Sequence, residues 1–269
     1  MKLSFVYITY RCGGLDILAD ALSNQTYKDF EIIIIDDFRP NRSNQVKEYF
    51  KSKGLEIAYI GPSKQKCFPE LTFGIFNAVN TGFIKSSGDI VVVCTDYQWF
   101  ESDCFEKIVS HKDKLNNKTC IVLPGIAWDC DKPRNISNII SIWDTHWKGS
   151  PQLNQCCKSF SWIPEGMEFA LTAYPWNIIE EMNGFPEYLD AVSEQPLDPI
   201  MESFNLVGAK AYVDINNFMH MIIHRNWEPR ELWYQSVRKA TGPTELIKRA
   251  NTFDLKKIHE ERIKECQLL

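Results

Sequence analysis

Several features are scarce or absent in this 269-residue sequence, and each absence excludes a class of protein. The longest apolar runs, IIII and IVVVC, are far too short to cross a bilayer, so we expect no transmembrane segment. There is no basic excess, because the net charge is −5, and this argues against a nucleic-acid partner. The nine cysteines form no C-x-x-C pair, which argues against a zinc site and favours reduced thiols.

Targeting and linker signals are also missing. The N-terminal stretch MKLSFVYITYRCGG enters a strand pattern directly and lacks the small-residue cleavage region of a signal peptide. We therefore expect a cytoplasmic protein. No internal repeat, low-complexity segment or obvious linker interrupts the chain, which predicts one domain over residues 1–269.

What the sequence does contain is a regular alternation of apolar runs and helical periodicity over its first 125 residues. The runs predict strands at 3–9, 30–36, 55–61, 89–95 and 119–125, and the periodicity predicts helices at 15–25, 43–54, 70–88 and 102–115, the last capped by Ser102. Nearly continuous apolar strands separated by helices indicate an α/β fold. Its sheet should be mostly parallel, with helices on both faces.

Polar side chains follow the expected strands where those strands end. They are Thr9, Tyr10, Asp36, Asp37 and Asp96. Ligands of parallel sheets bind in the crevice beyond the carboxyl ends of the strands. A buried strand end carrying acids is costly unless the acids face a ligand, a cation or water. We therefore expect a ligand site at this edge.

The alternation fails after residue 125. Residues 126–165 are rich in Trp, Asn, Lys, Pro and Cys and indicate loops and short irregular elements. A strand-like run covers 210–224, and residues 229–269 read as two helices. The last of these is charged and amphipathic, so contact with a membrane surface stays open beside a solvated helix.

Three ordered stretches carry a resemblance to a known family. They are LSFVYITYRCGGLDILADALSNQTYKDFEIIIIDD (3–37), NAVNTGFIKSSGDIVVVCTDY (77–97) and GMEFALTAYPWNIIEEMNGFPEYLD (166–190). Together they resemble the family-2 glycosyltransferases. The resemblance implies a GT-A fold with a Rossmann-like, nucleotide-sugar-binding half at 1–125. It also implies a smaller acceptor-side and catalytic half at 126–228, followed by the helical tail at 229–269.

The resemblance assigns residues to the donor. Asp37 matches the aspartate that hydrogen-bonds the nucleotide base, and Thr9 and Tyr10 line the same pocket. Asn80 falls in the stretch similar to A-R-N-x-G and is also expected in nucleotide-sugar binding. Asp36 is interpreted as a structural neighbour. The alternative is that both adjacent acids cap the following helix or turn.

A divalent metal, Mn²⁺ or Mg²⁺, is implied on the leaving diphosphate, where it would act as a Lewis acid. Asp96 matches the second acid of the family's D-x-D pattern, but Cys94 replaces the first. His224 is the expected histidine ligand, with His220 as the alternative, although His220 between two methionines reads as a core residue. Arg225 is expected to contact the diphosphate.

The catalytic base is expected after the segment that ends at 190. Glu194 is the first candidate, although Gln195 stands where relatives have an acid. Asp198 is the second candidate and Asp190 a third, and capping of a helix is the alternative role for Glu194 or Asp198.

These assignments predict an inverting glycosyltransferase. Its donor is expected to be a UDP- or GDP-linked sugar, and its acceptor a glycan or a lipid-linked or protein-linked hydroxyl. A different class remains open, in which a degenerate GT-A domain binds the nucleotide sugar without transfer. A nucleotidyltransferase is disfavoured, because no glycine-rich phosphate loop with a basic residue follows the first strand.

Overall fold

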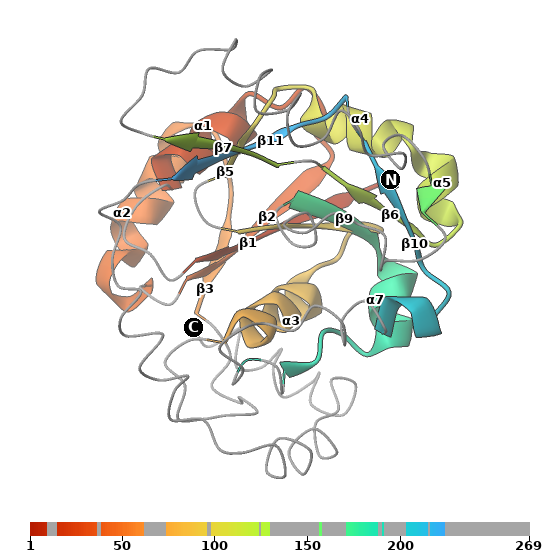
Figure 1. The fold of residues 1–269 in the computed structure, drawn as a ribbon. Coiled ribbons are helices and arrows are strands. Elements are labelled where there is room, and N and C mark those ends of the chain that lie inside the picture. Colours follow the sequence, from red (N-terminus) through yellow and green to blue (C-terminus); the bar gives the residue numbers. More distant parts are fainter. Residues whose placement is uncertain are drawn as a thin grey trace.

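The computed structural model describes residues 1–9, 15–36, 39–61, 74–95, 98–123, 125–129, 156–157, 171–187, 190, 203–214 and 216–223. They form a central sheet, a smaller second sheet and the helices that cover the central sheet (Figure 1).

Strands and helices alternate through the first 94 residues, as the apolar runs predict. The elements are β1 (Leu3–Thr9), α1 (Leu15–Ser23), β2 (Phe30–Asp36), α2 (Arg39–Ser52), β3 (Ala58–Ile60), α3 (Ile75–Lys85) and β4 (Ile90–Cys94). Every side chain of β1 and β4 is buried. Such strands have no solvent-facing side, because helices cover both faces of the sheet.

The central sheet has the strand order β3-β2-β1-β4-β9-β6-β10-β8. Its later strands are β6 (Thr119–Val122), β8 (Cys156–Cys157), β9 (Leu171–Pro175) and β10 (Lys210–Val213), and α7 (Trp176–Met182) follows β9. β9 runs antiparallel between β4 and β6, and β8 runs antiparallel to β10. The other neighbouring strands are parallel, which confirms the mostly parallel α/β sheet.

The second sheet has the order β5-β11-β7 and consists of β5 (Gln98–Phe100), β7 (Gly125–Asp129) and β11 (Met219–Ile223). Each of its strands follows a strand of the central sheet along the chain, since β5 comes after β4, β7 after β6 and β11 after β10. The strand-like run at 210–224 is therefore two strands in two sheets. The predicted start of irregular structure at 126 is wrong, because β7 continues to Asp129.

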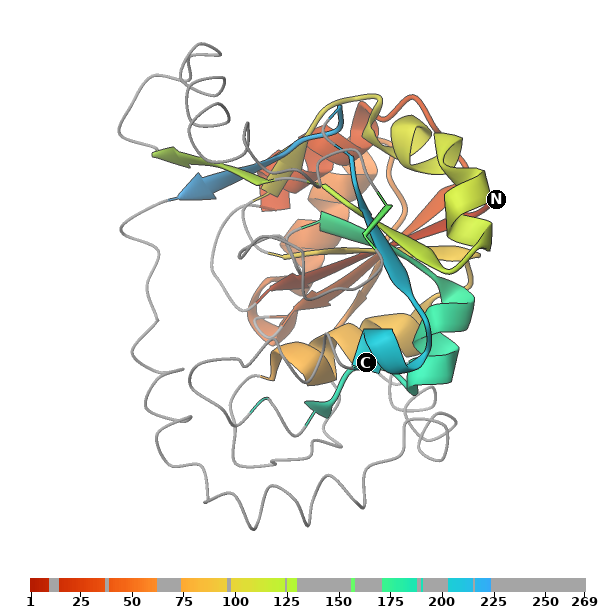
Figure 2. The ribbon, with the colours of Figure 1, turned by 45° about the vertical axis from the view of Figure 1, so that its right-hand side comes forward.

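Helices lie on both faces of the central sheet (Figures 1 and 2). Two layers of apolar side chains hold them against it. One layer packs beneath α3 and α7 and includes Val79, Phe83 and Ile178. The other packs beneath α1, α2, α4 (Cys104–Ser110) and α5 (Lys112–Asn116). The approach of α3 to β1 is close: a Cβ on Gly82 would lie 2.3 Å from Cγ1 of Val6.

The helix predicted at 102–115 is divided. The structure has α4 (Cys104–Ser110) and α5 (Lys112–Asn116), with His111 between them. Ser102 is not the N-cap. Asp103 occupies that position without a side-chain bond, and the Gln25 side chain accepts a hydrogen bond from the backbone N–H of Phe105 at 3.1 Å. Gln25, 80 positions before Phe105, thus supplies the hydrogen-bond acceptor for a backbone N–H in the first turn of α4. Local sequence signals cannot reveal such a contact.

Candidate functional site

The carboxyl ends of β1, β2 and β4 lie side by side at one edge of the central sheet. The register pairs Thr9 with Asp36 and Tyr7 with Cys94. Thr9 and Asp36 are both buried. The structure therefore brings the ends of these three strands together, as expected for a ligand crevice.

Asp36 is bonded inside the protein. The Tyr59 hydroxyl of β3 donates a hydrogen bond to its carboxylate. This contact joins the ends of β2 and β3 and gives the first of the two adjacent acids a structural partner. Asp37, the acid assigned to the nucleotide, lies outside the described residues.

Cys94 occupies the position of the missing first acid, and its side chain lies in the core layer beneath α1 and α4. Its thiol donates to Oε1 of Gln98 at 2.9 Å, and Nε2 of Gln98 donates to Oγ1 of Thr95 at 2.7 Å. These bonds link the end of β4 to the start of β5, on either side of positions 96 and 97. Asp96 itself lies outside the described residues.

His220 of β11 lies in the second sheet, in contact with Trp99 at a ring-centroid distance of 4.8 Å. Burial lowers the pKa of its imidazole to about 4. The Glu101 carboxylate lies 3.9 Å from Nε2 and would favour the charged ring, but it is half exposed, so burial dominates. His220 is thus a neutral, buried side chain at pH 7.

Asn80 of α3 is bonded entirely within the protein. Its Nδ2 donates to the Phe185 carbonyl at 2.9 Å and to Oε1 of Glu187 at 3.0 Å, while its Oδ1 accepts from the Phe185 N–H at 2.8 Å. The side chain has no exposed surface. The expected role of Asn80 in nucleotide-sugar binding stays a prediction, and the contacts seen here are with the protein's own chain. Asn80 holds the chain at 185–187 against α3.

Asp190 closes the first turn of α3. Its two carboxylate oxygens accept the backbone N–H groups of Phe76 at 2.8 Å and Asn77 at 3.0 Å. Space for the carboxylate depends on Gly74, because a Cβ there would lie 2.3 Å from Oδ2. Asp190 is 7% exposed and both of its oxygens accept hydrogen bonds, so it caps the first turn of α3.

Sequence reasoning missed the polar contacts between α3 and the chain that follows α7. Asn77 also donates to the buried Glu187 carboxylate, at 3.2 Å. One sequence signal was available. Two asparagines three positions apart, 77 and 80, interrupt an otherwise apolar helix, and buried amides need partners.

The other predicted site residues lie outside the described residues. These are Tyr10, Asp37, Asp96, Glu194, Asp198, His224 and Arg225, and the tail at 229–269 is outside as well.

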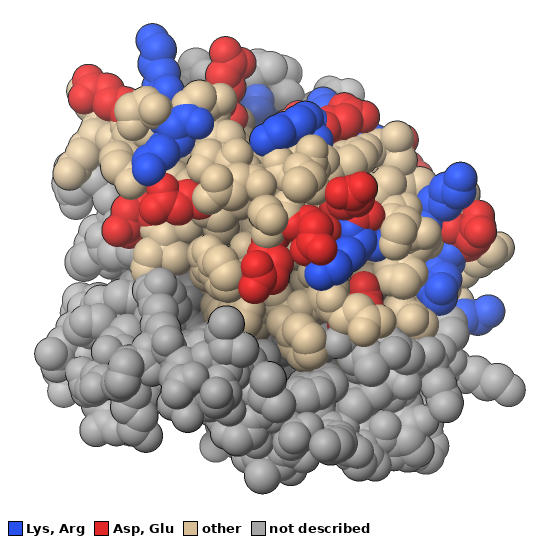
Figure 3. All heavy atoms as spheres, turned by 90° about the horizontal axis from the view of Figure 1, so that it is seen from above, with Lys and Arg blue, Asp and Glu red and all other residues tan. Residues whose placement is uncertain are grey.

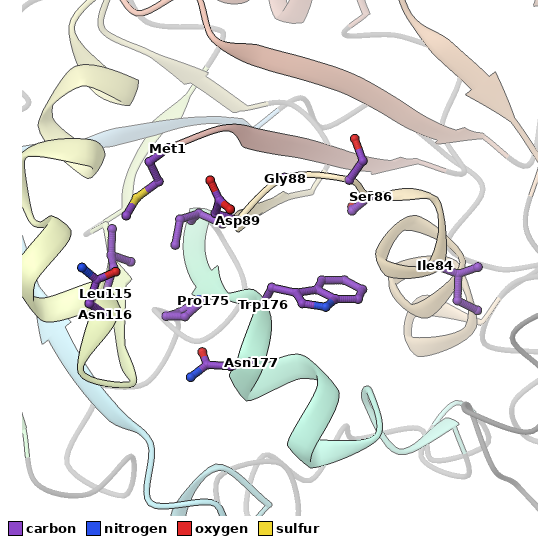
Figure 4. A pocket seen from close by; sticks show the side chains of 12 residues that line it. Met1, Ile84, Ser86, Gly88, Asp89, Leu115, Asn116, Pro175, Trp176 and Asn177 are labelled. Atoms are coloured by element: carbon purple, nitrogen blue, oxygen red, sulfur yellow. The ribbon is translucent and has the colours of Figure 1, made fainter.

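A pocket of about 680 Å³ lies at the opposite edge of the central sheet (Figure 4). Its walls include Met1, Gly88, Asp89, Leu115 and Trp176. Met1, Gly88 and Asp89 lie where β1 and β4 begin, and the Trp176 N–H of α7 donates to the Asp89 carbonyl at 3.0 Å. No strand end of the predicted crevice contributes to its walls. The pocket is therefore separate from the candidate site.

The described surface shows no area of one charge on the face seen in Figure 3, where acidic and basic side chains are interspersed. Ion pairs such as Lys53–Asp20 at 2.6 Å and Lys107–Asp103 at 2.9 Å occur on the described surface. Among the helices that the structure describes, none has both the length and the apolar content needed to cross a membrane.

Comparison with known sequences shows which protein family the chain belongs to. The profile of Glycosyl transferase family 2 matches residues 4–159, more than half of the chain, and the protein belongs to that family. An uncharacterized glycosyltransferase, YwdF of Bacillus subtilis (strain 168), is 33% identical over 109 residues. That match covers 40% of this chain and 37% of YwdF.

Solved structures agree with a GT-A fold. S. aureus TarS 1–349 in complex with UDP-GlcNAc is 13% identical with a TM-score of 0.54, covering 96% of this chain and 75% of that one. The mannosyltransferase PcManGT from Pyrobaculum calidifontis, in complex with GDP-Man and Mn²⁺, is 14% identical with a TM-score of 0.55. Here the coverage is 96% of this chain and 69% of the other. A longer TarS structure is matched over only 38% of its length.

Proposed function

We propose that this protein is an inverting glycosyltransferase that moves a sugar from a nucleotide-diphosphate sugar to an acceptor hydroxyl. The observation that carries the proposal is the meeting of the carboxyl ends of β1, β2 and β4 at one edge, in a chain of glycosyltransferase family 2. In open α/β sheets, that edge is where ligands bind.

The donor side of the proposal uses Thr9, Tyr10 and Asp37 to hold the nucleotide. UDP-GlcNAc is bound to TarS and GDP-Man to PcManGT, which supports a UDP- or GDP-linked hexose as the donor. Acceptor classes consistent with the proposal are a glycan, a lipid-linked sugar and a protein-linked one, used in the cytoplasm or at a membrane surface.

Asp96, His224 and Arg225 are proposed to neutralise the leaving diphosphate. β5 and β11 are antiparallel and pair Gln98 with Met221, so the start of β5 and the end of β11 at Ile223 lie toward the same end of the second sheet. Carboxylate and imidazole are donors that suit Mn²⁺. When bound, such an ion supplies Lewis-acid stabilisation of the phosphoryl oxygens. The Mn²⁺ bound to PcManGT is consistent with this.

Glu194 is proposed as the base. Its carboxylate takes the proton of the acceptor hydroxyl while that oxygen attacks the anomeric carbon, and the bond from this carbon to the diphosphate oxygen breaks on the opposite face. The configuration at the anomeric carbon is thereby inverted. Asp198 is the second candidate for this role.

A binding protein without transfer activity is the second candidate function. It is favoured by Cys94, whose thiol is buried in the core where a D-x-D acid would stand, and by Gln195 beside Glu194.

Turnover of the Glu194→Gln variant tests the proposal. The change keeps size and most hydrogen bonds but removes the proton acceptor, so kcat should fall about 10²- to 10⁴-fold while donor affinity stays the same. Transfer is measured by nucleotide release with a panel of UDP- and GDP-sugars and acceptors, and donor affinity by calorimetry.

Asp198→Asn is the matched comparison. Full activity of Glu194→Gln together with an inactive Asp198→Asn would move the base to Asp198. Donor binding without turnover by the wild type, across the whole panel, would favour the binding protein.

A further inference from the structure

The chain between α7 and the proposed base is attached to α3 at successive points. Asn183, the C-cap of α7, has a left-handed backbone with φ of 59°, and Gly184 follows with φ of 73°. Phe185 and Glu187 then bond to Asn80, Glu187 bonds to Asn77, and Asp190 reaches the N–H groups of Phe76 and Asn77. The contacts of residues 185, 187 and 190 therefore follow one another along α3 toward its first turn. Figure 2 shows the position of α3 below the central sheet.

The first turn of α3 lies at the edge of the sheet where the ligand crevice is expected. α3 ends at Lys85, a few residues before β4 begins at Ile90, so its last turn is at the edge where β4 starts. Its 11 residues span about 16 Å at 1.5 Å per residue, which brings the first turn to the carboxyl-end edge. Asp190 sits at that turn.

The contact at Asp190 is strong for a single side chain. A helix N-terminus carries unpaired N–H groups and a partial positive charge, and a carboxylate satisfies both. Each carboxylate oxygen of Asp190 accepts a hydrogen bond from one backbone N–H, and the side chain is nearly buried. Gly74 provides the room, so the fit depends on two residues that are 116 positions apart in the chain.

We propose that Asp190 is a positioning residue for catalysis: its carboxylate, held on the first turn of α3 against Gly74, fixes the point from which the chain carries Glu194 to the acceptor. Glu194 is four residues beyond Asp190, within about 14 Å of extended chain. This role rests on the proposed glycosyl transfer and its base. Misplacing a catalytic group by about 1 Å can cost 10²-fold in rate, so such an anchor has a measurable effect.

Asp190→Asn tests the proposal in the full chain. Asparagine replaces one acceptor oxygen with an NH₂ group that faces an N–H donor, so one of the two bonds is lost. We expect kcat to fall about 10- to 100-fold with donor KM and donor affinity unchanged. Gly74→Ala should reproduce this loss, because its Cβ takes the place of the carboxylate.

Two control variants separate positioning from general loss of stability. Gln25→Ala removes the side chain that bonds the first turn of α4, and Gly82→Ala places a Cβ against Val6 within α3 itself. Both should lower the unfolding temperature and leave kcat at the wild-type value. Loss of kcat in these controls equal to that of Asp190→Asn would overturn the proposal.

A double variant links Asp190 to the base. If Asp190 acts through Glu194, Asp190→Asn combined with Glu194→Gln should be no slower than Glu194→Gln alone. If the fold-losses in kcat of the two single variants multiply in the double variant, the link between Asp190 and Glu194 is overturned. An active wild type with an unaffected Asp190→Asn would overturn this inference alone, whereas a wild type without turnover would overturn the proposed function and the role of Asp190 with it.

Discussion

At the level of single residues, the buried polar side chains near the candidate site share one role, which is to hold segments of the backbone together. Asp36, Asn80 and Asp190 each bond to another segment of the chain: to Tyr59, to Phe185 with Glu187, and to the first turn of α3. Buried polar groups are costly without partners, so these contacts fix the backbone around the site. Asp37, proposed to hold the nucleotide, directly follows Asp36, and Glu194, the proposed base, is four residues after Asp190.

His220 gives the protein a predictable pH dependence. Its folded pKa is about 4, below its ordinary value of 6.5, so the unfolded chain binds more protons between these values. Stability is complete above pH 6.5, falls as the pH drops toward 4 and levels off below. Between pH 7.5 and 5, the wild type should lose about 2 kcal/mol more than His220→Phe, measured by urea unfolding.

Glu101→Gln is the control for this prediction. Its carboxylate is 54% exposed and 3.9 Å from the imidazole, so removing its charge should leave the wild-type pH dependence intact. Identical pH profiles for the wild type and His220→Phe would show that His220 is not the titrating group.

Three elements meet around Glu31 at the amino ends of the strands. The Glu31 carboxylate on β2 accepts the Ser4 hydroxyl of β1 at 2.5 Å, the Ser87 N–H before β4 at 2.6 Å and the Lys2 ammonium at 3.2 Å. Burial by itself would raise the pKa of Glu31, but the bonds from Ser4, Ser87 and Lys2 outweigh it and the pKa is lowered. The charged carboxylate thus stabilises the packing of β1, β2 and the turn after α3.

Glu31→Gln should destabilise the protein by about 1 kcal/mol at pH 7, since the carboxylate is partly exposed and its bonds are partly screened. A lowered folded pKa adds stability above the unfolded value, and that stability disappears as the pH falls through the folded pKa. The difference between wild type and variant in urea unfolding should therefore shrink from pH 7 to pH 3.

Asp20→Asn provides the comparison for this prediction. Asp20 pairs with Lys53 at an exposed position, so this change should lower stability less than Glu31→Gln does. An equal effect of the two variants would mean that the Glu31 contacts contribute no more than a surface ion pair.

At the scale of the whole molecule, the two sheets are joined by short connections on one side of the protein. β4 leads into β5 and β10 into β11, and antiparallel pairing of β5 with β11 links both routes. A ligand that contacts the end of β4 and the end of β11 would therefore stabilise both sheets at once.

Nucleotide diphosphate with Mn²⁺ should raise the unfolding temperature more than either alone. Ligand at 100 times its Kd adds about 2.7 kcal/mol, or roughly 5–10 °C for a domain of this size. Asp96→Asn should abolish the additional shift due to Mn²⁺, measured by calorimetric scanning with and without chelator.

Asp89→Asn is the matched control, because Asp89 lies just before β4, at the opposite end of the same strand, and accepts the Lys2 N–H at 2.8 Å. It should keep the full Mn²⁺ increment. If Asp96→Asn keeps the additional rise in unfolding temperature due to Mn²⁺, then neutralisation of the leaving group by Arg225 without metal is favoured.

Local sequence patterns were sufficient for the elements of the first half. Continuous apolar runs predicted β1, β2 and β4, because a strand buried on both faces needs apolar side chains at every position. The same pattern placed Thr9 and Asp36 at one edge of the sheet, since parallel strands end together. Two of the three stretches that resemble family 2, residues 3–37 and 77–97, lie in this half of the chain.

Tertiary structure decided what depends on contacts between distant segments. No local sequence signal indicates that β9 runs antiparallel or that residues 210–224 are divided between two sheets. The same holds for the start of α4, where the Gln25 side chain, and not Ser102, accepts a backbone hydrogen bond. Asn80 and Asp190 were read from motifs as site residues, yet their partners lie more than 100 positions away. The sequence by itself determined which polar residues are present, whereas packing determined which of them the protein uses to hold its own backbone.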